Sequence, residues 1–507
     1  MSQSYTSKAV GGFQWGTASM IFTTIMHIGY TSVMSRLLDP KAFGLIAVAQ
    51  IIINFGGYFS RLGMTKALIQ KKEISNEDIR AVFTSSLILS CFFTILFWFL
   101  APFSSLILQK VDDEVVSIIR LMSLSFLING FATTSRALLT RQLKFKLQSI
   151  QEVSSFLFGY ILVGISSGIL GMGVWSLVLA NLSQLLFAAI FSFSAARHNV
   201  VPTFNYSYHQ PFLLYGSKLS SISFLDFIGQ NIPPFLIGLF FGDYLLGIFR
   251  QAYMIITLPL RRLAMNFQHV LFPMYSAFQF EKDKLKNAFL SSSTLLAAII
   301  LPIGFSMSVA SKEIVLVVFG DGFIESYPIL RILSIGICFK FVTELAGIIC
   351  DATAKLKFKF IIELSNLIIL IIAAFSLKSF GLIGFAWILT INELIRTIAY
   401  MFFTRNFLQL RVKDYVNLYY PGFFIGIISA INVYLITIIF RYLEFLLLPT
   451  LICQVTIGFI TLAYFTVFNP PNSLRDIIRN RILTLAFFEN KGKRLLKYIK
   501  WYNANEV

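Results

Sequence analysis

Long apolar runs separated by short polar segments follow one another along the whole chain. A run of about 20 mostly apolar residues can cross the hydrocarbon core of a membrane as a helix. About 14 such runs are present, at residues 13–35, 43–63, 81–108, 116–139, 150–170, 174–195, 212–240, 245–270, 288–310, 328–350, 359–377, 381–404, 417–440 and 446–468. The pattern predicts an all-α integral membrane protein with about 14 transmembrane helices.

Two of these runs contain helix-breaking residues. Pro233, Pro234 and Pro259 interrupt the seventh and eighth runs, and such breaks are tolerated where the backbone faces protein or water instead of lipid. The first run is longer than the core of a signal peptide and lacks a small-residue cleavage site. We therefore expect it to be an uncleaved first span.

The polar loops alternate in charge. IQKKEISNEDIR and RQLKFK are rich in Lys and Arg, whereas LLDPKAF and GILGMG, on the other side, are not. Loops rich in Lys and Arg stay on the cytoplasmic side of a membrane. The alternation predicts a multi-pass protein of the bacterial cytoplasmic (inner) membrane with both termini in the cytoplasm.

Composition supports a membrane protein. Hydrophobic residues make up 57% of the chain and charged residues 13%, against about 45–50% and 25% in soluble domains. The net charge of +18 does not indicate nucleic-acid binding, because the basic residues punctuate apolar runs; it sets orientation and attracts anionic lipids. The four cysteines show no metal or redox spacing and are expected to be free thiols: Cys91, Cys338, Cys350 and Cys453.

The chain repeats itself at an offset of about 211 residues. RLMSLSFL at 120 matches RILSIGIC at 331, Gly173 matches Gly384, and Asn181 matches Asn392. The tetrapeptide LKFK occurs twice at an offset of 213, which predicts one short insertion. LLDPKAFGLIAVA also matches FFGDYLLGIFRQA. These matches predict two homologous lobes of six helices.

Six is an even number, so both lobes enter the membrane from the same side and are related by a pseudo-two-fold axis along the membrane normal. The predicted divisions are a lobe at 1–200, a lobe at 201–415, two extra helices at 416–470 and a basic tail at 471–507. The tail is either an amphipathic helix on the inner leaflet or a mobile segment. A substrate path is expected between the lobes.

Motifs for enzymatic chemistry are absent from the sequence. There is no GxxxxGK[ST] loop for ATP, no HExxH and no nucleophile elbow. An integral-membrane glycosyltransferase would show a large outer loop or an acidic catalytic cluster, and the outer loops are short. We therefore expect a transporter without cofactor, metal or catalytic residues.

Ionisable residues at membrane depth are costly and indicate function. Arg36 either attracts an anionic headgroup at a cavity mouth or snorkels to the interface. Lys340 and Glu344 are four residues apart, so they share one helix face and can pair. The pair either lines the cavity, with Lys340 meeting a phosphate, or is structural. With these three, Asn181 and Asn392 are the substrate-binding candidates.

Three further residues are candidates for binding a coupling ion. Asp226 either binds a proton or cation or pairs with a basic residue. His27 either titrates during transport or packs through a hydrogen bond. Glu363 lies in the eleventh run, and Glu393 and Arg396 in the twelfth are weaker candidates.

The run SRLLDPKAFGLIAVAQIIINFGGYFSRLGMTKALIQKKEISNEDIRAVF resembles the N-terminal signature of the Wzx-type polysaccharide exporters, in the colanic-acid and teichuronic-acid exporter branch of the multidrug/oligosaccharidyl-lipid/polysaccharide superfamily. RALLTRQLKFK, GMGVW, LIGLFFGDYLLGIFRQAY and VLFPMYSAFQFEKDKLK continue the likeness in order, over at least residues 10 to 290. The resemblance implies a MATE-like pair of lobes and a flippase that works by alternating access. Its substrate would be an oligosaccharide on undecaprenyl diphosphate, moved to the outer leaflet for surface polysaccharide (O-antigen, capsule or exopolysaccharide).

One position departs from the family pattern. Relatives tend to carry Asn-x-Asp before the LIG of the seventh helix, where this chain reads NIPPFLIG with Asn231 and Pro233. The coupling ion is therefore open, and Asp226 is a possible substitute. The implied partners are the lipid-linked oligosaccharide, membrane lipids and polysaccharide polymerase or assembly proteins. The alternatives are a multidrug or organic-cation antiporter and a non-transporting assembly scaffold.

Overall fold

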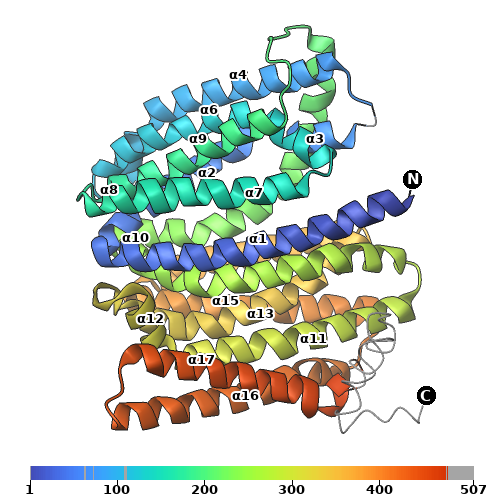
Figure 1. Cartoon of the computed structure of the whole chain (residues 1–507). Helices are drawn as coiled ribbons and strands as arrows, with labels where there is room; N and C mark the ends of the chain where they lie inside the picture. Colours follow the sequence, from blue (N-terminus) through green and yellow to red (C-terminus); the bar gives the residue numbers. More distant parts are fainter. Residues whose placement is uncertain (1, 62–63, 72, 108–110, 476, 478–507) are drawn as a thin grey trace. The chain divides into compact units, whose positions relative to one another are not determined.

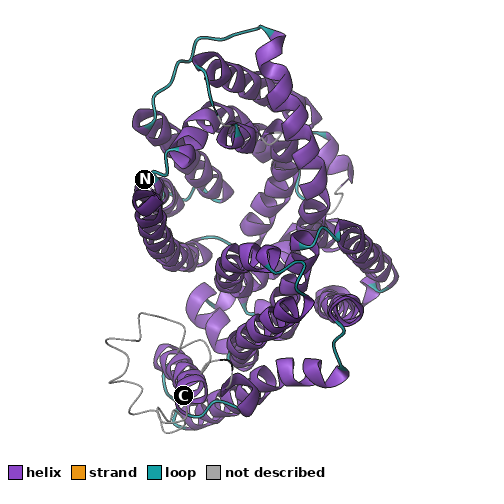
Figure 2. Ribbon diagram, turned by 90° about the vertical axis from the view of Figure 1, so that its right-hand side faces the viewer, coloured by secondary structure: helices purple, strands orange, loops and turns teal. Residues whose placement is uncertain are grey.

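The computed structural model describes residues 2–61, 64–71, 73–107, 111–475 and 477. Within these ranges the chain is built of helices and loops without strands (Figure 2). It divides into two compact units: a first unit of residues 1–250 and 318–322, and a second unit of residues 251–317 and 323–507. The basic tail beyond residue 477, and with it the two structures expected for that tail, lies outside the described residues.

The first unit contains the helices of the N-terminal half together with most of one very long helix, α10 (Figure 1). In chain order its elements are α1 (Ser2–Leu37), α2 (Pro40–Arg61), α3 (Met64–Gln70), α4 (Asn76–Leu100), α5 (Phe103–Ile107), α6 (Glu114–Arg141), α7 (Phe145–Phe156), η1 (Leu157–Ile165), α8 (Ser166–Ile169), α9 (Val174–Ala195) and α10 (Tyr206–Ala277) up to residue 250.

The second unit begins with the remainder of α10. Its further elements are α11 (Lys282–Val309), α12 (Ser311–Phe319), η2 (Asp321–Phe323), α13 (Ser326–Ala352), α14 (Leu356–Ser376), η3 (Lys378–Phe380), α15 (Gly381–Leu408), α16 (Val412–Tyr442), α17 (Leu447–Ala463) and η4 (Tyr464–Phe468). Residues 318–322, at the end of α12 and the start of η2, pack with the first unit.

Within the described residues, each predicted apolar run is mainly helical, and the run at 81–108 is divided between α4 and α5. Twelve helical spans of the described chain are long and apolar enough to cross a membrane. The seventh and eighth runs share α10, where the backbone turns at Gly242 (φ 85°) and not at the prolines. Only a residue without a side chain adopts this φ readily. The first run lies in α1, which is outside the twelve, so the total of 14 stays a prediction.

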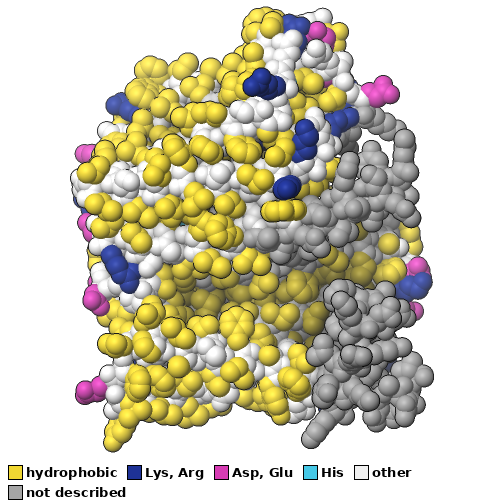
Figure 3. Space-filling model, in the orientation of Figure 1, with side chains coloured by type: hydrophobic (Ala, Val, Ile, Leu, Met, Phe, Trp, Pro, Cys, Tyr) yellow, Lys and Arg dark blue, Asp and Glu magenta, His cyan; other side chains and the backbone are white. Residues whose placement is uncertain are grey.

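Helix burial separates core helices from lipid-facing ones. In α13, 83% of the apolar window is buried, whereas in α14 and α17 only 11% is. Figure 3 shows hydrophobic side chains over most of the visible face, with Lys, Arg, Asp and Glu side chains toward the helix ends. This distribution is typical of a protein whose solvent is lipid along the middle of its helices.

The turn after α6 and the turn after α13 have the same backbone conformation. Leu143 and Ala354, 211 residues apart, both have positive φ (54° and 55°). The next amide in each turn, that of Lys144 or Lys355, donates to the carbonyl five residues earlier, at 3.0 and 2.8 Å. The repeat is therefore in register at 211, and the two LKFK tetrapeptides lie two residues out of register. The predicted insertion is wrong.

Side chains close both turns in the same way. Gln148 donates to Thr140 Oγ1 at 2.7 Å after α6, and Lys359 donates to Asp351 Oδ2 at 2.8 Å after α13. Both pairs span eight residues and differ by the same offset. The repeat extends from the sequence to the hydrogen bonds of these turns.

Matching residues of the two repeats also meet inside the first unit. A Cβ added to Gly44 in α2 would overlap the backbone of Asp243 in α10, and a Cβ added to Gly247 would overlap the carbonyl of Pro40. Pro40 and Gly44 are separated by four residues, as are Asp243 and Gly247. Small residues at this spacing let two membrane helices touch through their backbones.

Lys41 and Asp243 hold the loop before α6 beside this crossing of α2 and α10. Lys41 Nζ lies 2.6 Å from Asp112 Oδ2, and the amide of Asp112 donates to Asp243 Oδ2 at 3.1 Å. The hydrogen bond from Lys41, with one from the Glu114 amide, holds the pKa of Asp112 below its usual range. The loop before α6 is thereby tied to the start of α2 and to the bend of α10.

Candidate functional site

A π-helical stretch in the first unit brings two of the predicted residues together. Tyr160 lies in η1 and receives a long hydrogen bond, 3.4 Å, from the side-chain nitrogen of Asn181 in α9. The ring of Tyr160 lies 5.9 Å from that of His27 and 4.8 Å from that of Tyr30, both in α1. π-helical turns are rare and occur frequently at functional sites. Nothing in the apolar pattern of this helix had pointed to Tyr160.

Arg250 of α10 completes this first cluster. Its guanidinium donates to the side-chain oxygen of Gln50 in α2 and lies within electrostatic reach of Tyr160. It is partly buried and forms no ion pair with any residue that the structure describes. Tyr30 is 4% exposed, and its hydroxyl lacks a hydrogen-bond partner within the same ranges. The cluster therefore presents a cation and several donors without a counter-charge.

The other predicted side chains of α1 have structural partners. Arg36 is exposed at the end of α1 and donates to the carbonyl and hydroxyl of Ser32 at 2.7 and 2.8 Å. It also donates to the carbonyl of Val318 at 2.9 Å. His27 lies 3.4 Å from the hydroxyl of Thr31 and packs against the ring of Phe156 at 5.7 Å. These contacts fit the structural roles that were the alternatives for both residues: an Arg36 that lies at the helix end and a His27 that packs through a hydrogen bond.

In the second unit, α13, α14 and α15 bring four charged residues together. Arg396 lies 3.0 Å from Glu363 and 3.1 Å from Glu393. Lys340 reaches Glu393 at 3.9 Å. These contacts join Glu393 and Arg396, the weaker candidates, to Lys340 and Glu363. Opposite charges that pair in this way lower the cost of lying at membrane depth.

The structure does not contain the ion pair that the spacing of Lys340 and Glu344 permits. Within the part of the chain that the structure describes, Glu344 has no ion pair within 4.0 Å and no hydrogen bond to its side chain. The four-residue spacing permits the pair, but Glu393 on the facing helix α15 takes the ammonium instead. Lys340, Arg396 and Arg261 still act on the Glu344 carboxylate at longer range.

Hydrogen bonds to Glu363 are concentrated on one oxygen. Tyr400 donates to Glu363 Oε1 at 2.8 Å, and Arg396 donates to the same atom through two nitrogens at 3.0 and 3.2 Å. Asn392, one turn before Arg396, is 5% exposed. Its side-chain oxygen has no hydrogen-bond partner among the described residues. The second cluster is therefore rich in acceptors.

The side chain of Asp226 lies outside the described residues. No group of three or more His, Cys, Asp or Glu side chains within the described ranges is arranged to hold a metal ion.

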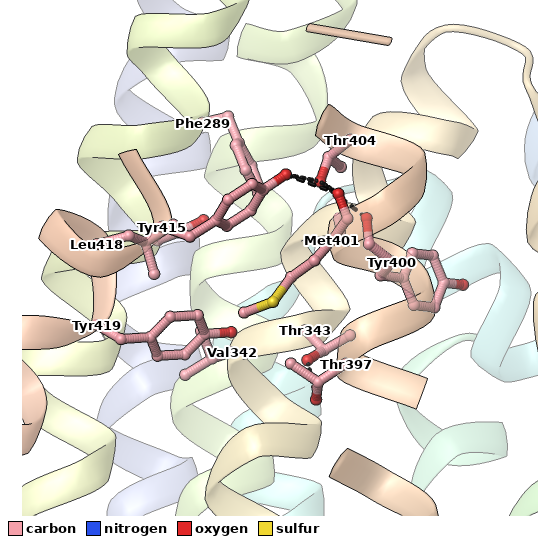
Figure 4. A pocket seen from close by; sticks show the side chains of 12 residues that line it. Phe289, Val342, Thr343, Thr397, Tyr400, Met401, Thr404, Tyr415, Leu418 and Tyr419 are labelled. Atoms are coloured by element: carbon pink, nitrogen blue, oxygen red, sulfur yellow. Dashed lines mark hydrogen bonds between the residues drawn. The ribbon is translucent and has the colours of Figure 1, made fainter. Parts of the chain in front are cut away.

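A small hydroxyl-lined cavity lies in the second unit between α11, α13, α15 and α16 (Figure 4). Tyr415 donates to the carbonyl of Met401 at 2.8 Å, and the hydroxyls of Thr343 and Thr397 lie 2.8 Å apart. Figure 4 shows the hydroxyl of Tyr400 directed away from these groups. The volume of about 20 Å³ holds about one water molecule. This cavity is too small for a saccharide.

Solved structures share the fold. A structure of the lipid II flippase MurJ in an inward closed conformation matches with a TM-score of 0.69 and 15% identity, over 91% of this chain and 99% of that one. An inward-facing multidrug resistance MATE family transporter of the MOP superfamily matches with a TM-score of 0.59 and 14% identity, over 75% and 94%. At these identities the likeness shows the fold, and the MATE-like expectation is confirmed.

Sequence comparisons lead to polysaccharide biosynthesis. The chain is 21% identical to the lipopolysaccharide biosynthesis protein WzxC of Escherichia coli K12, over 86% of this chain and 89% of the relative. It is 23% identical to the teichuronic acid biosynthesis protein TuaB of Bacillus subtilis, over 66% and 68%. It is 25% identical to the succinoglycan biosynthesis transport protein ExoT of Rhizobium meliloti, over 66% and 67%. The family model for polysaccharide biosynthesis proteins matches residues 33–328, and the chain belongs to this family.

Proposed function

We propose that this chain is a flippase that moves undecaprenyl-diphosphate-linked oligosaccharide repeat units from the inner to the outer leaflet, for the synthesis of a surface polysaccharide. Its family membership and the names of its relatives, a succinoglycan transport protein among them, support this function. So does its fold, which a lipid II flippase shares. The protein is then a transporter and not an enzyme.

The observation that carries the proposal is Arg250, which has no counter-charge among the described residues. A guanidinium at membrane depth is costly unless it is paired or serves a ligand. Gln50 and Tyr160 are neutral, so they leave the charge of Arg250 free to attract an anion. Arginine binds phosphate oxygens through several parallel hydrogen bonds. The diphosphate of the lipid carrier is an anion of this kind. Asn181, which donates to Tyr160, is a further donor of the first cluster.

The physics of the membrane favours the proposed direction. With a potential negative inside, moving an anion outward gains about 2.3 kcal/mol per charge per 100 mV. The saccharide and diphosphate need a wet, polar path, whereas the polyprenyl chain can stay in lipid. Two lobes related by an axis along the membrane normal provide such a path by alternating access.

The remaining predicted residues take proposed roles in this scheme. Lys340, Glu344 and Asn392 are proposed substrate contacts of the second unit. Arg36 is a proposed substrate contact near the outer end of α1. Glu363, His27 and Asp226 are proposed for ion coupling, by proton or sodium. Glu363 is the best supported of the three, because it belongs to the charged cluster at the middle of α13, α14 and α15.

The cellular setting follows from the same proposal. The protein would lie in the bacterial inner membrane with both ends in the cytoplasm, as the distribution of Lys and Arg predicts. Polysaccharide polymerase and assembly proteins would receive its product. An organic-cation antiporter is the alternative. The observation that favours it is Glu344, which forms no ion pair with any residue that the structure describes.

Mass spectrometry of undecaprenyl-diphosphate-linked saccharides tests the proposal. Cells without the gene, or with Arg250→Gln, should accumulate a lipid-linked repeat unit and lose surface polysaccharide, because the headgroup is no longer attracted. Arg331→Gln is the matched control, since Arg331 is exposed and lies over the ring of Tyr327, 5.6 Å from its centre. An unchanged lipid-linked pool and normal surface polysaccharide in the deletion strain would refute the proposal and favour the cation antiporter.

A further inference from the structure

The two charged clusters differ in chemistry. The first cluster, around Arg250, offers a cation and neutral groups. The second cluster contains three carboxylates, Glu344, Glu363 and Glu393, and its two cations form direct ion pairs with the last two of them. An anionic group would therefore find different partners at the first cluster than a hydroxyl-rich group would find at the second.

Glu344 is the most available of these carboxylates. It lies in the middle of α13, is partly exposed, and has no ion pair or hydrogen bond to its side chain among the described residues. An intramembrane carboxylate without a partner is expected to serve a ligand. Of its longer-range cationic neighbours, Lys340 and Arg396 are already engaged by Glu393 and Glu363, and Arg261 is exposed.

Two further acceptors of the second cluster lie on the neighbouring helices α14 and α15. The direct bonds that the structure describes to Glu363 all end on Oε1, which leaves Oε2 for another donor. Asn392 is buried, and its oxygen is unpartnered within the described ranges. It precedes Arg396 by four residues, so both lie on one face of α15. A buried acceptor without a donor is costly, and a bound ligand or water would satisfy it.

Ionised carboxylates only accept hydrogen bonds. Sugar hydroxyl and amino groups donate them, and bonds to a charged acceptor are about twice as strong as neutral ones. A sugar that carries its own carboxylate would be repelled by Glu344 at short range in a low-dielectric site.

We infer that the second cluster, centred on Glu344, is a saccharide subsite that selects neutral or amino sugars and disfavours acidic ones. The inference rests on the proposed function, because it assigns the sugar part of the same substrate. It makes Glu344 a specificity-determining residue. It also accounts for a carboxylate that the ion pairs of α13, α14 and α15 leave out.

The test is binding to the purified full chain in lipid nanodiscs. Three probes are used: a polyprenyl diphosphate without sugar, one with a neutral trisaccharide, and one with a trisaccharide that contains one hexuronic acid. The unaltered protein should bind the neutral-sugar lipid more tightly than the hexuronic lipid. Glu344→Gln should reduce this preference by roughly fivefold or more, because one like charge is removed at close range.

Controls separate the subsite from general charge effects. Glu281→Gln removes one exposed carboxylate of the same unit, which pairs with Lys284, and should leave the preference unchanged. Glu344→Asp keeps the charge and should keep most of the preference. The sugar-free lipid should bind equally to the Glu344→Gln variant and to the unaltered protein, because it carries no sugar for the second cluster to select.

The outcomes distinguish the two proposals. If all three lipids bind but the unaltered protein shows no preference, or if Glu344→Gln keeps the preference, the saccharide subsite is wrong and the flippase proposal stands. If none of the lipids binds, the proposed function itself fails. The preference of the unaltered protein for the neutral-sugar lipid over the hexuronic lipid tests the saccharide subsite even if a variant does not fold.

Discussion

Arg396 shows how a single residue holds charges at membrane depth. Its guanidinium bonds Glu363 on one side and Glu393 on the other, and its side chain is 10% exposed. A buried charge of this kind is stable only while both of its partners are present. Arg250 has no such partners in the described chain, and this contrast separates a structural cation from one available to a ligand.

Replacing Arg396 by Ala should destabilise the second unit strongly. Two partly buried carboxylates would lose their cation, which costs about 3–5 kcal/mol when one partner of a buried ion pair is removed. Thermal unfolding in detergent should show a large fall in midpoint. Arg405→Ala on the same helix is the control, because Arg405 is exposed. Equal midpoints for the two variants would contradict this account of the network.

At the scale of elements, glycine decides how closely helices meet. α2 and α10 touch through Gly44 and Gly247, and each glycine faces the backbone of the residue four positions before the other. Backbone atoms cannot move aside as a flexible side chain can. In both repeats the glycine lies four positions after the residue that the other glycine contacts: Gly44 follows Pro40, and Gly247 follows Asp243.

Gly247→Ala should lower stability by about 1–3 kcal/mol, the usual cost of overpacking, because the new methyl group overlaps the Pro40 carbonyl. Gly29→Ala is a matched control with the opposite sign. Nothing lies within 4 Å of a Cβ at Gly29, and alanine favours a helix over glycine by about 1 kcal/mol. Both are read by thermal unfolding of the purified protein. A stable Gly247→Ala variant would show that the helices do not cross this closely.

At the scale of the whole chain, the compact units do not follow the repeat. The repeat divides the sequence near residue 200, whereas contacts divide it at 250/251. The connection between the repeats is fastened to the first unit: Arg80 of α4 donates to the carbonyls of Val201 and Pro202 at 2.9 and 3.0 Å. The crossing of α2 with α10 extends the first unit further. The division at 200/201 therefore remains a prediction about ancestry and not about packing.

Membrane potential should affect the direction of transport. A substrate that leaves as an anion gains about 2.3 kcal/mol per charge from a potential of 100 mV. Removing this potential should therefore lower the ratio of lipid-linked saccharide in the outer leaflet to that in the inner leaflet by at least tenfold. Valinomycin with potassium in right-side-out vesicles provides the measurement. The Arg250→Gln variant gives the baseline without transport. A ratio that persists without potential would assign the drive to an ion gradient, with Glu363 as the first residue to replace.

Particular residues show how far sequence reasoning reaches. The charged positions Lys340, Glu363, Glu393 and Arg396 were recognisable because ionisable residues are rare in apolar runs. Their pairing was not, since the partner of Lys340 lies 53 positions away on α15 and not one turn away on α13. Arg250 stands in a quoted motif, but its lack of a counter-ion becomes visible only when its neighbours are known.

The sequence by itself determined the helical spans, the relation between the repeats and the expected orientation, because length, hydropathy and loop charge are local properties that the bilayer reads directly. The tertiary structure decided which charges meet. It placed Tyr160 beside Asn181 through a π-helical turn, gave Lys340 to Glu393, and left Glu344 and Arg250 without direct counter-ions in the described chain. These outcomes depend on contacts between distant segments, which no local pattern of residues specifies.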